Sequence, residues 1–359
     1  MGSMQSTGTG TASDEPTRLA DIIAPMFGGQ SGWSQRLQNG VQAELIAGAD
    51  AQDDCAVFGI DGAMEIVVGS DYVRGPKFQL YELGYLSNYD IGYYLAMANL
   101  SDIAAMGALP IALLTVVRYP RSLPDDDFTA LMEGIRDACR QAGTPNVGGD
   151  IGSAERIILS ASAVGIVERG GSLLRTGARA GDRLCVTGPT GVAASAQRYF
   201  GGLGPGSAKL PPAEEEVLIS AWRRPQALVR EGRCLSTSGV VTSCQDTSDG
   251  LKAGVQSLAA AGGVGFVVEE SALPVADIVA EVARLTNGDL TSVVLGDSVD
   301  FQLVFTVAED GVSQLSKIFA DAGLDFCDIG YATEEREVRL RRADGREEEL
   351  PGVPWRHAT

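Results

Sequence analysis

Seven aspartates stand among small or apolar residues, where surface acids are uncommon. They lie at the ends of apolar runs, in glycine-rich turns and in one apolar helical stretch: Asp53, Asp54, Asp71, Asp102, Asp150, Asp246 and Asp249. Asp102 is the sharpest case, because the helical spacing of residues 88–108 puts apolar side chains on nearly every side of it. Burying an ionised carboxylate costs several kcal/mol unless a cation or hydrogen bonds offset the loss of water.

The composition points to a metal ion as that cation. The chain has four lysines (Lys77, Lys209, Lys252 and Lys317), and its one histidine is His357, close to the end. A ligand set made of carboxylate oxygens, without histidine or cysteine, selects hard cations and Mg²⁺ above all. We therefore predict a Mg²⁺ site built from these aspartates.

Each aspartate also has a purely structural interpretation. Asp54 could end a turn, Asp150 could form an Asx-turn after Gly148–Gly149, and Asp249 could cap a helix that starts near Leu251. Taken singly, each of these explanations is as good as metal binding. Seven separate explanations would be needed for the whole set, so one shared cation site is the simpler hypothesis.

Several functional classes are excluded by what the sequence lacks. The histidine content argues against a Ser-His-Asp triad and a histidine-bound zinc, and six scattered cysteines without a CxxC pair indicate reduced thiols. Neither a Walker A sequence nor a GxGxxG turn between strand and helix occurs. A net charge of −19 argues against nucleic acid as a partner. With no long apolar run and no signal peptide, we expect no membrane span and a cytoplasmic location.

The periodicity predicts two domains that both mix helices and strands, of the α/β or α+β class. We expect a flexible tail over 1–17, a first domain over 18–170, a second over 171–345 and a tail over 346–359. In the first domain a short helix is predicted over 18–27, with loops over 28–52 and 144–150. Longer elements are predicted as strands at 56–60, 65–71, 111–119 and 156–168 and helices at 88–108 and 124–143.

At this point the motifs resemble a known family. "DDCAVFG", "NLSDIAAMGALP", "GGD", "LLRTGARAGDRLCVTGPTG", "DTSDGL" and "DFQLVFTV" occur in the order seen in thiamine-monophosphate kinases, over roughly residues 20–335. That family is related to aminoimidazole ribonucleotide synthetase, selenophosphate synthetase and the hydrogenase maturation dehydratase. The pair "NLSDIAAMGA" and "DTSDGL" is specific to this superfamily and is closer to its thiamine-monophosphate kinase branch.

The resemblance implies an ATP-dependent, Mg²⁺-dependent enzyme. It implies an N-terminal α/β domain that contributes to a barrel-like interface in a homodimer, and a C-terminal α+β domain beside it. It adds Ser248 as an oxygen ligand to the seven aspartates and assigns the catalytic step to Asp150 and Asp249. The implied nucleotide-binding residues are Asp54, Gly148, Gly149, Thr187, Gly188 and Gly191.

The part of the chain that should bind the acceptor departs from the family pattern. The stretch after Asp71 reads "YVRGPKF" in place of "LVEGVHF", and "SGGEDYEL" becomes "LGDSVDFQL". The residues that we predict to contact the acceptor are Arg74, Lys77, Arg118, Arg223 and Asp300.

The leading hypothesis is phosphoryl transfer from ATP to thiamine monophosphate or a related small acceptor. An acceptor that is already a phosphate needs no strong base, because its oxygen is anionic at neutral pH. One alternative is an ATP-dependent cyclase or ligase that activates an amide or carbonyl oxygen, as the ribonucleotide synthetases do. Another is a nucleotide-binding subunit without activity, motivated by the altered "LGDSVDF" segment.

Overall fold

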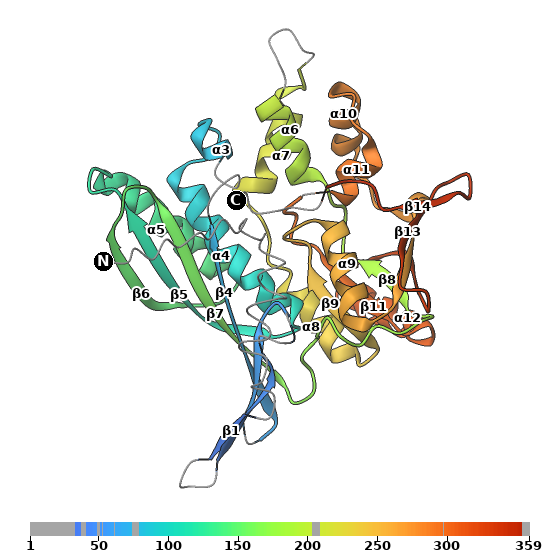
Figure 1. Ribbon diagram of the computed structural model, residues 1–359. Coiled ribbons are helices and arrows are strands. Elements are labelled where there is room, and N and C mark those ends of the chain that lie inside the picture. The colour runs from blue at the N-terminus through green and yellow to red at the C-terminus, as the bar shows by residue number, and fades with distance from the viewer. Residues whose placement is uncertain are drawn as a thin grey trace, which may run out of the picture.

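The structure is a computed structural model that describes residues 33–36, 41–48, 51, 53–60, 62–73, 79–202, 209–296 and 298–353. The predicted tail over 1–17 and helix over 18–27 lie outside the described residues, as do Arg74, Lys77 and His357. Two sheets of seven strands each lie side by side with helices between and around them (Figure 1). The class is the mixed α/β class that the sequence predicts.

The first sheet has the order β1-β2-β3-β4-β7-β5-β6, with β5 and β6 parallel and every other pair antiparallel. Its strands are β1 (Ser34–Arg36), β2 (Gln42–Ala47), β3 (Ala56–Ile60), β4 (Met64–Val73), β5 (Leu109–Tyr119), β6 (Asn146–Ser153) and β7 (Ile158–Glu168). The four strands predicted in this region are confirmed. The described strands form an open sheet, not a closed barrel.

Among the described residues, helices cover one face of this sheet and leave the other open. The covering helices are α4 (Asn88–Ala105) and α5 (Asp125–Gln141), which follow the short helix α3 (Gln79–Glu82), and α4 packs on both β4 and β7. Buried and half-buried residues alternate along β7, with Leu159, Ala161 and Ala163 on the covered face. On β5 the open face carries Leu114 and Val116, which are 39% and 36% exposed.

Helix α4 is the central element of the molecule. It begins at a capping box between Ser87 and Asp90, and 15 of its 18 residues are buried. Helix α5 approaches it closely because both helices place a glycine at the contact: a Cβ on Gly92 or Gly134 would come within 2.1 Å or 2.0 Å of the facing backbone. The predicted apolar helix is therefore confirmed, but Asp102, near its C-terminal end, is half-buried and is not one of the 15 buried residues.

The second sheet has the order β14-β13-β10-β12-β8-β11-β9. Its strands are β8 (Arg183–Val186), β9 (Val241–Asp246), β10 (Gly265–Glu269), β11 (Leu303–Val307), β12 (Cys327–Thr333), β13 (Val338–Arg341) and β14 (Glu347–Glu349). The helices around it are α6 (Val192–Gly202), α7 (Pro212–Arg223), α8 (Val229–Ser238), α9 (Leu251–Gly262), η4 (Glu270–Ala272), α10 (Asp277–Leu285), α11 (Leu290–Leu295), η5 (Glu309–Gly311) and α12 (Val312–Asp321).

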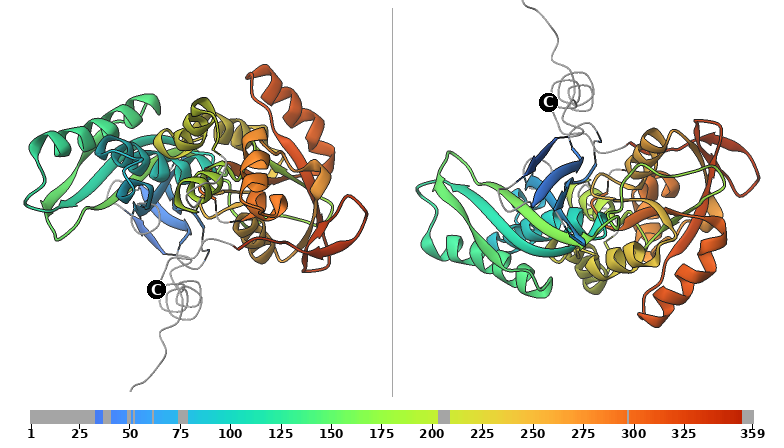
Figure 2. Two further views of the ribbon diagram at one scale, coloured as in Figure 1. Left: turned by 90° about the horizontal axis from the view of Figure 1, so that it is seen from above. Right: turned by 90° about the horizontal axis from the view of Figure 1, so that it is seen from below.

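The two halves lie side by side, with the ribbon of β1 and β2 projecting from their junction (Figure 2). The first sheet ends at Glu168 and the second begins at Arg183, so the strands divide on either side of residue 170. Residues 346–353 of the predicted C-terminal tail are folded: they include β14, and Lys252 Nζ donates to the carbonyls of Leu350 and Gly352 at 2.6 and 2.9 Å.

Two predicted loops are strands. Part of the 28–52 loop forms β1 and β2, and most of the 144–150 loop belongs to β6. Glycine and asparagine usually indicate a turn, but Gly148 and Gly149 adopt φ values of +150° and +139° while the chain stays paired with β5. A Cβ on Gly149 would lie 1.8 Å from the Thr115 carbonyl oxygen, so the strand can approach β5 only because glycine stands there.

No helix in the described part of the chain is long and apolar enough to cross a membrane.

Candidate active site

Three of the predicted aspartates meet at the junction of the two halves. Asp54 lies on the loop before β3, Asp102 on α4 and Asp246 at the end of β9. Each offers a carboxylate oxygen, and these oxygens all lie within 4.8 Å of one another. We call these three residues the aspartate cluster. Carboxylates so close repel each other unless a cation lies among them.

Asp54 shows why a cation fits. Its side chain is only 5% exposed; Oδ1 pairs with the guanidinium of Arg175, and Oδ2 is buried without a hydrogen-bond partner among the described residues. Burial, together with the charges of Asp246 and Asp53, raises the pKa of Asp54 to about 7, although Arg175 opposes the rise. A buried carboxylate oxygen that lacks a partner and stands beside two other carboxylates is suited to bind a hard cation.

Serines hold Asp246 in place. Ser101 Oγ on α4 donates to Asp246 Oδ2 at 2.6 Å, and the amide and hydroxyl of Ser248 donate to Asp246 Oδ1 at 3.2 and 2.7 Å. Ser248 therefore lies beside the cluster, and its role as a metal ligand stays a prediction. Asp249 is exposed, and α9 has Gly250 as its N-cap with no side-chain capping bond. The predicted capping role of Asp249 is not observed.

Asp53 and Asp71 flank the aspartate cluster. Asp53 accepts bonds from the amides of Asp54 and Arg175 at 3.2 and 3.1 Å, while burial raises the pKa of Asp53. The amide of Asp71 donates to Asn99 Oδ1 at 2.9 Å. Because Asn99 precedes Asp102 by one turn of α4, this bond fixes the end of β4 against the helix that carries a cluster ligand.

Asp150 does not join the cluster within one chain. Through β7 and β5, the pairing register places Gly149 in line with Asp71, three strand spacings or about 14 Å away. Asp150 pairs in register with Val116 on the open face, opposite to the face that α4 covers. Its exposed carboxylate binds Arg118 Nη2 at 2.6 Å.

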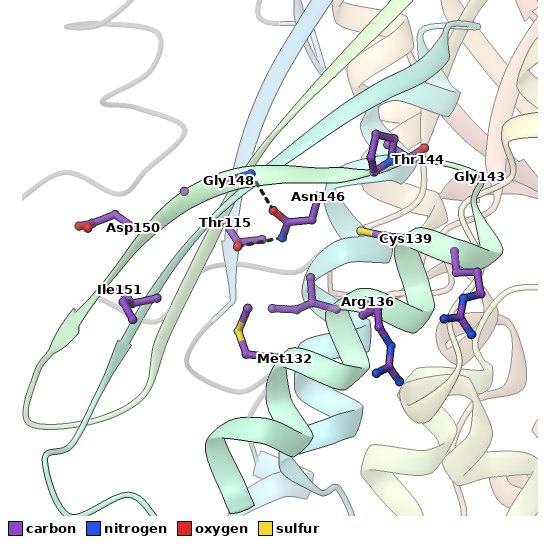
Figure 3. A pocket seen from close by; sticks show the side chains of 14 residues that line it. Thr115, Met132, Arg136, Cys139, Gly143, Thr144, Asn146, Gly148, Asp150 and Ile151 are labelled. Carbon is purple, nitrogen blue, oxygen red and sulfur yellow. Dashed lines mark hydrogen bonds between the residues drawn. The ribbon is translucent and has the colours of Figure 1, made fainter. Parts of the chain in front are cut away.

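A cavity of about 850 Å³ lies between α5 and the edge strand β6, next to the predicted nucleotide-binding glycines. Asn146 lines the cavity and connects its walls. Its amide nitrogen donates to Thr115 Oγ1 at 3.0 Å, and its side-chain oxygen accepts from the Gly148 amide at 3.1 Å. Ile151 and Met132 face the cavity, whereas the carboxylate of Asp150 points away (Figure 3).

The glycine-rich turn over 187–191 satisfies its polar groups inside the protein. Asp300 accepts from the amides of Gly191 and Ala193 at 2.5 and 3.0 Å, and Ser298 Oγ accepts from Ala194 at 3.1 Å, so these two residues cap α6. Thr187 Oγ1 is 2.8 Å from Gln302 Oε1. Nucleotide binding at Thr187, Gly188 and Gly191 and acceptor binding at Asp300 stay predictions, and the structure gives most of these groups other partners.

Arg223 is also held by the protein. It donates to the Tyr85 carbonyl at 2.8 Å and lies 3.3 Å from Glu216 and 3.8 Å from Asp90. Asp90 precedes Asp102 by 12 residues on α4, which corresponds to about 18 Å along the helix axis. The structure therefore places Arg223 far from the aspartate cluster, and an acceptor contact there stays a prediction.

Sequence reasoning missed the residues that support the cluster. Arg175 lies in the motif "LLRTGARAGDRLCVTGPTG" but is not among the predicted site residues, and Ser101 and Asn99 look like ordinary polar residues in an apolar helix. The available signal was their spacing, because Asn99 and Asp102 are one turn apart on α4.

Comparisons with known proteins agree with this architecture. Residues 52–167 match the N-terminal domain of the AIR synthase related proteins, and residues 179–342 match the C-terminal domain. The thiamine-monophosphate kinase of Pyrococcus abyssi is 32% identical over 75% of this chain and 79% of its own length; that of Bacillus subtilis is 28% identical over 80% and 86%.

Solved structures share the fold. The thiamine-monophosphate kinase of Stenotrophomonas maltophilia has a TM-score of 0.69, with 29% identity over 85% of this chain and 92% of its own. AaThiL complexed with AMPPCP and TMP has a TM-score of 0.73 over 85% and 91%, at 24% identity.

The two halves are thus the two domains of an AIR synthase related protein, one domain in each half. Carboxylates gather where the halves meet. Within that class, the chain belongs to the thiamine-monophosphate kinase family. It is an ATP-dependent kinase.

Proposed function

We propose that this enzyme transfers the γ-phosphoryl group of ATP to thiamine monophosphate or a closely related small phosphate, with Mg²⁺ held at the aspartate cluster. The bond between the γ-phosphorus and the β,γ-bridging oxygen breaks, and a new bond forms to a phosphate oxygen of the acceptor. ADP and the diphosphorylated acceptor are the products. The relatives named thiamine-monophosphate kinase support this choice of acceptor.

The observation that carries the proposal is the convergence of carboxylate oxygens of Asp54, Asp102 and Asp246 within 4.8 Å, with one buried oxygen of Asp54 lacking a hydrogen-bond partner in the part of the chain that the structure describes. ATP and the acceptor are both anions, so the carboxylates of the cluster alone would repel them. A bound cation removes that repulsion. When bound, Mg²⁺ supplies positive charge for the phosphate oxygens. We propose Asp53, Asp71, Ser248 and Asp249 as further oxygen ligands, since their positions surround the cluster.

The chain itself positions the ligands. Ser101 and Ser248 orient Asp246, Arg175 orients Asp54, and the backbone of α4 carries Asp102. Catalysis by such a site is mainly alignment and charge neutralisation, because an acceptor phosphate already carries an anionic oxygen. The described residues of the cluster include no histidine, which suits a reaction that needs no strong base.

The nucleotide and acceptor positions are proposed from their surroundings. Gly148 and Gly149 border the 850 Å³ cavity beside β6, which is large enough for a nucleoside. Among the predicted acceptor residues, Arg118 and Arg223 are in ion pairs. Arg74 and Lys77 follow directly after β4, close in sequence to Asp71, so we propose them as the acceptor's phosphate contacts.

We also propose a homodimer that forms through the open face of the first sheet. Leu109, Ile111, Leu114 and Val116 of β5 are each 36–49% exposed on the described chain. Contiguous exposed apolar residues of this kind mark an interaction surface. Asp150 and Arg118 lie on the same face, so pairing of two copies would bring them into the interface.

The test is incubation of the protein with ATP, Mg²⁺ and thiamine monophosphate, with nucleotides and thiamine phosphates separated by chromatography. Equal amounts of ADP and thiamine diphosphate are expected. ADP with free inorganic phosphate, and only when a nitrogen-bearing substrate is present, would instead identify the cyclase or ligase alternative. Turnover with a different phosphorylated acceptor would keep the reaction class and replace the acceptor.

A further inference from the structure

The last described residues cross back over the second half of the molecule. Strand β14 ends at Glu349, and the chain continues through residues 350–353, which we call the terminal strap. Leu350 is buried in the core of the second half, whereas Val353 is 68% exposed. The strap has no buried side chain after Leu350, so polar and backbone contacts hold its last three residues.

Lys252 supplies the polar contacts. It is the second residue of α9, and its Nζ donates to the carbonyl oxygens of Leu350 and Gly352 at 2.6 and 2.9 Å. Because both acceptors are main-chain oxygens, the lysine fixes the path of the backbone. A cavity of about 370 Å³ borders Lys252 and Leu350 between α9 and β13, so side-chain packing does not close this contact by itself.

Glycines bring the strap against the turn that follows β9. Gly352 has a φ of +86°, and a Cβ there would lie 2.9 Å from the Ser292 carbonyl oxygen and 3.0 Å from Gly296 Cα. Gly296 in turn meets Gly250, where a Cβ would lie 1.9 Å from the Gly296 carbonyl oxygen. Three chain segments are therefore stacked backbone against backbone, with Gly296 in the middle.

The turn at the inner side of this stack orients a cluster ligand. Ser248 precedes Gly250 by two residues and donates to Asp246 Oδ1 from its hydroxyl at 2.7 Å and from its amide at 3.2 Å. A shift of the strap would be transmitted through Gly296 to Gly250 and to the donors of Ser248.

We infer that Lys252 is a positioning residue for the aspartate cluster: it holds the terminal strap against Gly296, and the strap keeps the Ser248 donors on Asp246. Lys252 acts through the backbone of the strap. The inference rests on the proposed function, since its effect is expected at the proposed metal. Partners that orient a metal ligand typically change metal affinity or activity by about 10- to 100-fold when they are removed.

The experiment titrates the full chain with Mn²⁺, with free Mn²⁺ measured by electron paramagnetic resonance, in the wild type, Lys252→Met and Lys252→Arg. Lys252→Met removes the donors, and Lys252→Arg restores a cation with several donors. Arg183→Met is the matched control, because Arg183 also makes two bonds, to Asp328 at 2.8 and 2.9 Å, on a strand that β10 and β12 separate from β13.

A second pair of variants tests the strap without changing a charge. Gly352→Ala places a Cβ against Ser292 and Gly296, whereas a Cβ on Gly345 would have no neighbour within 4 Å. Both glycines have a φ of +86°, so Gly345→Ala reproduces the backbone strain without the contact. Circular dichroism melting of each variant reports whether it is folded.

Mn²⁺ binding should be about 10-fold weaker in Lys252→Met and Gly352→Ala and unchanged in Arg183→Met and Gly345→Ala, with Lys252→Arg closer to the wild type than Lys252→Met. In turnover assays, the Mg²⁺ concentration for half-maximal rate should rise in the two weakened variants, with kcat recovering at high Mg²⁺. A merely structural role would lower the melting temperature and leave the Mn²⁺ affinity of the folded protein unchanged.

The outcomes that overturn the inference differ from those that overturn the proposed function. Equal Mn²⁺ affinity in the wild type and in folded Lys252→Met and Gly352→Ala removes the role of Lys252 and leaves the metal site intact. No Mn²⁺ binding by the wild type removes the metal site and the role of Lys252 with it. Mn²⁺ binding without turnover of thiamine monophosphate removes the acceptor alone, and the titrations still decide the role of Lys252. If Lys252→Met does not fold, Gly352→Ala and Lys252→Arg decide it.

Discussion

At the scale of single residues, the chemistry depends on where each carboxylate finds its partners. Asp246 has hydroxyl and amide donors and Asp54 has a guanidinium, whereas Asp150 pairs with Arg118 on the opposite face of the first sheet. Aspartates that look alike in the sequence are thus divided by the fold into a buried group and an exposed one.

Asp102→Asn tests the aspartate cluster. The substitution keeps the shape but removes one negative ligand, so turnover should fall by at least about 100-fold, beyond the usual cost of losing a supporting residue. The melting temperature without Mg²⁺ should not fall, because the change relieves repulsion among the three carboxylates. Initial rates and calorimetric melting measure both effects.

Asp321→Asn is a suitable control, since Asp321 is an exposed acid at the end of α12. Unchanged turnover in Asp102→Asn at every Mg²⁺ concentration would contradict the metal assignment.

At the scale of elements, β6 shows how glycine can build a strand. Gly149→Ala should destabilise the protein more than Gly148→Ala, because both positions need a φ that favours glycine but only the Gly149 Cβ would meet the Thr115 carbonyl. We expect about 1–3 kcal/mol for Gly148→Ala and more for Gly149→Ala, measured by urea unfolding. Equal losses would mean that β6 moves away from β5 without cost.

The hairpin of β13 and β14 offers a test by pH. Glu270 accepts from Arg342 Nη1 at 2.6 Å, from the Ala343 amide at 3.0 Å and from Thr291 Oγ1 at 2.9 Å, and these bonds lower the pKa of Glu270 below its ordinary value of 4.5. A lowered pKa stabilises the fold above that ordinary value, and the stabilisation is lost as pH falls through the folded-state pKa.

Glu270→Gln should therefore be less stable than the wild type at pH 7, by about 1 kcal/mol, with the difference shrinking as the pH is lowered below 4. Unfolding by urea at both pH values measures this. Glu334→Gln, at an exposed position, should show no such dependence. A difference that stays constant with pH would exclude ionisation as its cause.

At the scale of the whole molecule, the open face of the first sheet decides the assembly. Val116→Lys should turn a dimer into a monomer, since a charge would be buried in the proposed apolar interface. Light scattering after gel filtration measures the mass. Val217→Lys is the matched control, because Val217 on α7 is 54% exposed and lies outside that face. A wild-type protein with the mass of one chain would contradict the homodimer.

Much of this architecture could be predicted from sequence because the patterns are local. The apolar spacing around Asp102 gives α4, and β-branched runs give β5 and β7. The strand at Gly148–Gly149 could not be predicted, because its conformation depends on pairing with β5, which is a tertiary contact. The face of the sheet on which Asp150 lies depends on the strand register. The pairing of Arg175 with Asp54 depends on a contact between segments that are far apart in the sequence. Neither can be derived from a local pattern.

The all-round burial of α4 has a consequence for how this protein tolerates mutation. In a helix with 15 of 18 residues buried, a substitution on almost any side changes the packing. The helix also carries Asp102 and the side chains that bond to Asp71 and Asp246. A saturation mutagenesis scan should therefore find α4 as intolerant along its apolar positions as at its aspartate. Sequence drift in this protein should accordingly concentrate on the exposed helices of the second half.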